Sequence, residues 1–148
     1  MICRCYQQLK SLFFTHPLGR SAPKSLKRGY LLYNIMEEEK VLLKNILEFY
    51  RNGLDTEKRG DFNSSVTLFF KALAVLGDLY ILRKEGKIPN SHSERFRILE
   101  EKYHGIYKIL DKDFLLYQNS YRIKLDKENS EVIKKDVEQL LELLEVRK

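Results

Sequence analysis

Hydrophobic residues recur every three or four positions along most of the chain, which is the spacing of one helical face. The first such stripe comprises Leu42, Ile46, Phe49 and Tyr50. The acidic residues that follow Met36 suit the first turn of a helix, because they complement its dipole. We therefore expect a helix that begins at Met36 and either ends at Gly53 or continues to about Arg59, before the stronger stop at Gly60.

The most apolar part of the chain follows this stop. It predicts a helix from Phe62 to about Lys84 with apolar residues on more than one face, which is typical of the central helix of a bundle. Lys71, Gly77 and Asp78 interrupt the apolar run, whereas a membrane span needs ~20 nearly uninterrupted apolar residues. The segment is therefore predicted to be a core helix and not a membrane span.

A connector with Gly86 and Pro89 separates this helix from a third one. Ser91 and Glu94 have the spacing of a capping box at its start. Its apolar stripe comprises Phe96, Leu99, Tyr103, Ile106 and Leu110. Gly105 is a possible point at which this helix splits in two.

Two further helices complete the pattern. Asp111 and Asp113 have the residue type of helix caps, and they predict the start of a fourth helix whose aromatic side chains, Tyr121 included, enter the core. A polar turn at residues 127–129 then leads to a last helix capped by Ser130. Its apolar seam comprises Ile133, Val137, Leu140 and Leu144.

No segment alternates with the period of two that a strand requires. The connections between the amphipathic segments are short, so neighbouring helices are expected to be antiparallel. The sequence predicts an all-α fold, an antiparallel up-and-down bundle of four to five helices.

Charge divides the 148 residues into two parts. Residues 1–35 hold six basic residues and no acidic ones, whereas residues 36–148 hold 21 of each sign. The net charge of +6 therefore belongs to the first part, and it does not indicate a basic nucleic-acid-binding domain. We expect residues 1–35 to be a disordered basic extension, with composition that also resembles an organellar transit peptide, and residues 36–148 to form the bundle.

Few residues in the chain suit a metal or a covalent mechanism. Cys3 and Cys5 are the only cysteines, and the three histidines lack the spacing of zinc ligands. The glycine-rich loops that bind phosphate are absent, and residues 36–148 contain no thiol. We therefore expect no metal and no cofactor, and the low cysteine content favours a reducing, cytoplasmic location.

Four segments of residues 37–147 resemble one known family. The run GDFNSSV at residues 60–66, followed by FFKAL at 69–73, resembles the entry into the second helix of HEPN domains. The run KIPNSH at 87–92 is similar to the connector after that family's long helix, and YQNSYR at 117–122 is similar to its aromatic-and-arginine segment.

This resemblance implies a small helical bundle that forms homodimers. Many HEPN proteins are metal-independent ribonucleases, often toxins neutralised by a small nucleotidyltransferase partner, and others are inactive binding modules. The catalytic members carry an Arg followed after four to six residues by a His, and the match here is Arg97 and His104. If both lay on one helix, they would share a face but stand ~10.5 Å apart along the axis.

The preferred hypothesis is a homodimeric module without a secure catalytic motif that binds RNA, a nucleotide or a protein partner. Its candidate nucleic-acid-binding residues are Asn119, Tyr121, Arg122 and Lys124. One alternative is a metal-independent endoribonuclease that uses Arg97 and His104. Another is a purely structural protein whose seam between Ile133 and Leu144 docks a partner helix.

Overall fold

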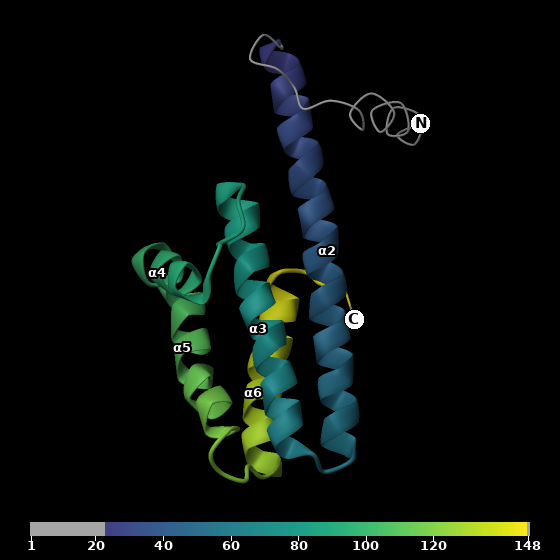
Figure 1. Cartoon of the computed structure of the whole chain (residues 1–148), viewed down its shortest axis with the longest axis vertical. Helices are drawn as coiled ribbons and strands as arrows, with labels where there is room; N and C mark the ends of the chain where they lie inside the picture. The colour runs from purple at the N-terminus through teal and green to yellow at the C-terminus, as the bar shows by residue number, and fades with distance from the viewer. Residues whose placement is uncertain (1–22, 148) are drawn as a thin grey trace. The chain divides into compact units, whose positions relative to one another are not determined.

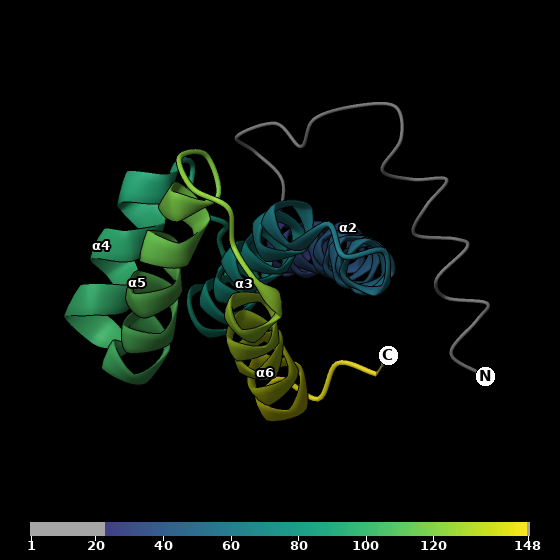
Figure 2. The same ribbon diagram turned by 90° about the horizontal axis from the view of Figure 1, so that it is seen from below.

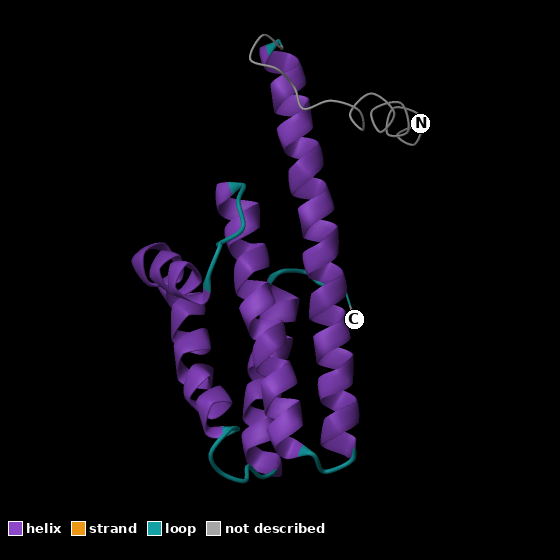
Figure 3. Cartoon of the chain, viewed as in Figure 1, coloured by secondary structure: helices purple, strands orange, loops and turns teal. Residues whose placement is uncertain are grey.

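The computed structural model of the protein describes residues 23–147, and every regular element in this range is a helix (Figures 1 and 3). The helices are α2 (Lys24–Lys58), α3 (Phe62–Glu85), α4 (His92–Lys102), α5 (His104–Asn119) and α6 (Lys127–Leu143). The predicted all-α class is therefore confirmed for the described part of the chain. Cys3 and Cys5 lie outside it.

The chain divides into two units between Glu37 and Glu38, and the second unit contains the bundle. The prediction that the first helix begins at Met36 is wrong, because α2 begins at Lys24, directly after Pro23, whose carbonyl oxygen accepts a hydrogen bond from the Lys27 N–H at 3.1 Å. Residues 24–35 are thus helical rather than disordered. No proline follows Pro23 in this stretch, and the helix continues through Gly29.

Helix α3 is the central element of the bundle, as predicted. It packs against α4, α5 and α6 (Figure 2). Thirteen of its residues are buried. Its length and composition alone would permit a membrane span, but 72% of the apolar stretch is buried inside the protein. This supports its prediction as a core helix.

Helix α2 lies close against α3 at Gly53. A Cβ atom at this position would lie 2.6 Å from Cε1 of Phe69, whose ring is fully buried and also contacts the ring of Tyr50. Gly53 is therefore a contact point within the helix rather than its end. The helix ends before Gly60, whose φ of 81° is favourable only for glycine.

The third predicted helix, which was expected to reach Leu110 with a possible split at Gly105, is interrupted earlier than that. Tyr103 ends α4 and begins α5, so the break precedes Gly105. Asp111 and Asp113 cap no helix, because α5 runs through them to Asn119. Asp113 is instead fully buried, so a tertiary environment outweighs its preference for a helix end.

Asp126, and not Ser130, caps the last helix. Its carboxylate accepts from the Asn129 N–H at 3.0 Å, and the Asn129 side chain accepts from the Asp126 N–H in return. Ser130 lies inside α6, where its hydroxyl is buried 2.7 Å from that of Ser65 on α3 and donates to Glu57 on α2. This network joins three helices at one end of the bundle.

The apolar seam of α6 faces the interior of the bundle. Ile133, Val137 and Leu140 are fully buried, and Leu144 is 5% exposed. The hypothesis that this seam docks a partner helix is wrong, since the chain itself covers these side chains.

Candidate nucleic-acid interface

The connection between α5 and α6, residues 120–126, is held by one side chain of α3. The Asn63 amide nitrogen donates to the carbonyl oxygens of Ser120 and Ile123, each at 2.7 Å. Its amide oxygen accepts from the Leu125 N–H at 3.0 Å. An amide group suits this position because it supplies two donors and an acceptor at once. The three bonds give the connection a defined shape.

This clamp brings together two segments that the family resemblance singled out, the start of α3 and the end of α5. The hydroxyls of Thr67 and Ser120 lie 3.1 Å apart beside it. The sequence did not reveal the role of Asn63. Asparagine is common near the start of a helix, so the residue type alone did not indicate a distant partner.

Tyr121 is exposed, which corrects its prediction as a core residue. Its side chain is 69% exposed, and its hydroxyl lies 2.7 Å from that of Tyr117. Tyr117 in turn stacks on the buried ring of Phe70 at 4.6 Å between centroids. The hydrogen bond to Tyr121, together with burial, raises the pKa of the Tyr117 hydroxyl. Tyr121 is therefore an outward ring attached to the core through one neighbour.

Arg122 and Lys124 are the cations beside this ring. Both are exposed, and neither has an ion-pair partner among residues 23–147. By contrast, Lys127 pairs with Glu131 at 3.4 Å. Asn119 is half-buried and contributes its main chain, because its carbonyl oxygen accepts from the N–H of Arg122 and of Ile123, both at 3.0 Å. The four predicted residues thus form one continuous turn, in which Tyr121, Arg122 and Lys124 face solvent.

We call Tyr121, Arg122 and Lys124 the α5–α6 surface. It lies at the same end of the bundle as the turn between α2 and α3 (Figure 1). An exposed aromatic ring beside two unneutralised cations is suited to stack on a nucleobase and to bind its phosphates.

Arg97 and His104 do not form a comparable site. The break at Tyr103 places them on different helices, so the expectation that they share one helix face is wrong. Arg97 forms an exposed ion pair with Glu101 at 3.0 Å, and Nδ1 of His104 lies 3.3 Å from the carbonyl oxygen of Glu100. Both residues are on the surface beside the apolar stripe.

His104 does line a hollow of about 410 Å³, together with Tyr80, Lys102, Tyr103 and six further residues of α5 and α6. The polar groups there already have partners, because Glu85 accepts from Lys102 at 2.8 Å and from the Tyr103 hydroxyl at 3.2 Å. The hydrogen bond from Lys102 lowers the pKa of Glu85. Arg97 is not among the lining residues. Lys102, the lysine of this hollow, is therefore already paired with Glu85 and is not free to bind a phosphate.

The two predicted sets of residues lie far apart. His104 begins α5 and Asn119 ends it. At a rise of 1.5 Å per residue, they are separated by ~22 Å along the helix. One combined active site is thus not formed within the chain.

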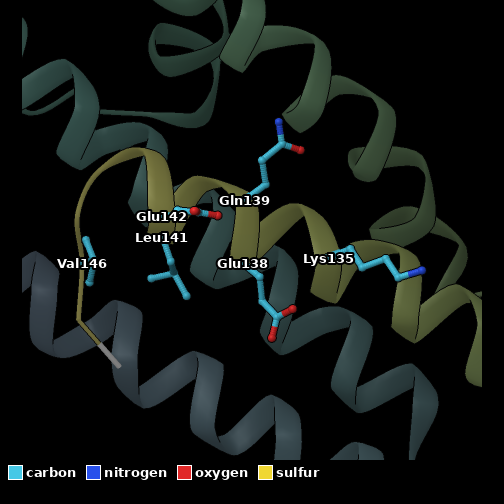
Figure 4. Close-up of a pocket in the computed structure, with 6 residues that line it drawn as sticks. All are labelled: Lys135, Glu138, Gln139, Leu141, Glu142 and Val146. Atoms are coloured by element: carbon cyan, nitrogen blue, oxygen red, sulfur yellow. The ribbon is translucent and has the colours of Figure 1, made fainter.

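A larger hollow of about 600 Å³ lies beside α6 and the segment that follows it (Figure 4). It is lined by Lys135, Glu138, Gln139, Leu141, Glu142 and Val146. Glu138 accepts from the Tyr50 hydroxyl at 2.6 Å. Two carboxylates against one lysine make this hollow unfavourable for a polyanion.

The most unusual ionisable group is Asp113 on α5. Its side chain is fully buried, and the ammonium group of Lys112 lies 3.7 Å from Oδ1 and also contacts Asp136 on α6. Burial, followed by the adjacent Asp136 carboxylate, raises the pKa of Asp113 to about 8. The sequence had indicated only a helix cap here. No group of three or more metal-ligating side chains occurs among the described residues.

In comparisons with family models, with curated proteins and with solved structures, the chain matches none. The HEPN resemblance and the small nucleotidyltransferase partner that it implies therefore stay predictions from the sequence motifs.

Proposed function

We propose that this chain is a HEPN-like module that works in the cytoplasm as a homodimer and binds single-stranded RNA without cleaving it. The observation that carries this proposal is the α5–α6 surface, in which Asn63 holds a turn that exposes Tyr121 beside two unpaired cations.

Each part of this surface has a physical role in the proposal. Stacking of a base on an aromatic side chain contributes ~1–3 kcal/mol and tolerates any base, because every base has a flat face. Arg122 and Lys124 supply the charge that attracts phosphate. Residues 36–148 carry equal numbers of basic and acidic residues, so their net charge does not attract RNA. Within the bundle, the attraction to phosphate must therefore come from Arg122 and Lys124.

Single-stranded RNA suits the surface better than duplex does. Tyr121 stands on a short turn, and the edge of a stacked duplex offers no open base face to such a ring. Proteins that recognise RNA by sequence or by stacking act mainly on unpaired bases for this reason.

The test is fluorescence anisotropy of a labelled single-stranded RNA titrated with the full chain at low salt. The Arg122→Gln/Lys124→Gln variant and the Tyr121→Ala variant should each weaken binding by about tenfold, which corresponds to ~1.4 kcal/mol. Lys44→Gln/Arg51→Gln is the matched control, because it removes two exposed cations from α2. Equal binding by all four proteins would contradict the proposal.

A further inference from the structure

Exposed apolar side chains concentrate on the first part of α2. Of the ten large hydrophobic side chains that are exposed among the described residues, four lie between residues 26 and 36: Leu26, Leu31, Leu32 and Met36. Leu31 and Leu32 are more than half exposed, at 56% and 55%. We call these four residues the α2 patch. Leu32 and Met36 are one turn apart on the same side of the helix, with Leu31 next to them in the chain. Exposed apolar residues gathered in this way are typical of an interaction site.

Charge is distributed unevenly around the α2 patch. Lys24, Lys27 and Arg28 lie at its N-terminal end, and Glu37 and Glu38 follow it on the same helix. Leu31 and Leu32 lie midway between the basic and the acidic residues. A second copy laid antiparallel would therefore place each basic end within about one turn of the other copy's acidic end, with the leucines at the centre.

We propose that the α2 patch is the homodimer interface, formed by two antiparallel copies of α2. This inference rests on the homodimer in the proposed function and adds its location. The arrangement is an isologous twofold contact, in which the same residues serve both copies. A parallel pair would set basic residues against basic residues and acidic against acidic, so the charges favour the antiparallel pair.

The size of the patch sets the strength of the contact. Residues 24–38 of one helix extend over ~22 Å. One helix pair of this length lies at the small end of specific interfaces, so we expect a dimer that dissociates in the micromolar range and weakens as salt is raised.

The first experiment is sedimentation velocity of the full chain over the micromolar concentration range. The wild type should dimerise, and Leu31→Ser/Leu32→Ser should raise the dissociation constant at least tenfold. Leu115→Ser/Leu143→Ser is the matched control, since these two leucines are each 61% exposed on other helices. Circular dichroism of each variant verifies that the helices are retained.

The second experiment reverses the charges. Lys24→Glu/Lys27→Glu/Arg28→Glu should weaken the dimer, and adding Glu37→Lys/Glu38→Lys to the same chain should restore it. If the two helices were parallel, the first variant would dimerise as strongly as the wild type, because like charges would face one another in both proteins.

The outcomes separate this inference from the proposed function. A dimer that neither the leucine nor the charge variants affect overturns the α2 interface and leaves the homodimer intact. A chain that is monomeric throughout the micromolar range overturns both the interface and the homodimer, whereas RNA binding is measured independently.

Discussion

The Asn63 side chain donates a 2.7 Å hydrogen bond to the main chain of Ile123, sixty residues away. With its bonds to Ser120 and Leu125, it sets the shape of the turn that carries the α5–α6 surface. A residue without a charge or a reactive group thereby positions those that are proposed to bind RNA.

Replacing Asn63 by alanine should destabilise the protein and weaken RNA binding together. Loss of the side chain leaves half-buried main-chain groups without partners, which costs ~1–3 kcal/mol in the free energy of unfolding. Urea unfolding and RNA anisotropy measure the two effects. Asn52→Ala, an exposed asparagine on α2, should change neither. An Asn63→Ala protein with wild-type RNA affinity would show that the clamp does not position the surface.

Asp113 makes stability depend on pH. Its folded-state pKa of about 8 lies above its ordinary value of 3.8, so the folded state holds a proton that the unfolded state releases. The protonated Asp113 contributes to the free energy of unfolding in full below its pKa in the unfolded state. This contribution is lost as the pH rises through its pKa in the folded state.

Asp113→Asn keeps the shape of the side chain and removes this titration. Its free energy of unfolding, relative to the wild type, should therefore rise between about pH 4 and pH 8 and then level off. Urea unfolding across this range measures the difference, with Asp111→Asn, an exposed neighbour, as the control. A difference that stays constant over the range would show that Asp113 has an ordinary pKa.

The buried pair of Asp78 and Arg95 joins α3 to α4. Arg95 donates to both carboxylate oxygens at 2.7 Å, and its third contact is Nδ1 of His92 at 2.8 Å. Removing either charge leaves the other buried and unpaired, so Asp78→Ala and Arg95→Ala should each cost ~3–5 kcal/mol. The double variant should cost much less than the sum. Additive losses in urea unfolding would mean that the two side chains do not interact.

Gly53→Ala tests the close approach of α2 and α3. Alanine is favoured over glycine by ~1 kcal/mol within a helix. The new methyl group would, however, force the buried Phe69 ring to move, and overpacking costs ~1–3 kcal/mol. We expect a net loss of stability. Gly105→Ala, where a Cβ meets nothing within 4 Å, should lose none. A more stable Gly53→Ala protein would indicate that the ring has room to shift.

The proposal also predicts that the full chain leaves RNA uncut. Arg97 and His104 lie on separate helices, and Arg97 is paired with Glu101. Gel analysis of labelled RNA, incubated without metal, should show no products. Cleavage that is abolished by His104→Ala would instead establish the ribonuclease alternative.

Sequence periodicity was sufficient to predict the helices, because the positions that face the core are occupied by apolar residues. Ile46 and Leu73, both fully buried, are examples. It failed where a polar residue has a tertiary partner. Asp113 and Ser130 have the residue types of helix caps, yet each is buried against another helix. Local spacing contains no information about such partners.

The candidate site was predictable in part. The stretch from Asn119 to Lys124 stood out through its aromatic and basic residues, but the exposure of Tyr121 depends on where α5 ends. That end is set by the bonds from Asn63, which is remote in the sequence.

The salt dependence of RNA binding reports whether Arg122 and Lys124 contact phosphate groups. For single-stranded nucleic acid, the logarithm of the binding constant falls with the logarithm of salt concentration by ~0.7 per phosphate contacted. Measured over about 50–200 mM salt, Arg122→Gln/Lys124→Gln should reduce this slope by ~1.4, and Lys44→Gln/Arg51→Gln should leave it unchanged. An unchanged slope in the first variant would show that RNA is bound elsewhere on the chain and not at the α5–α6 surface.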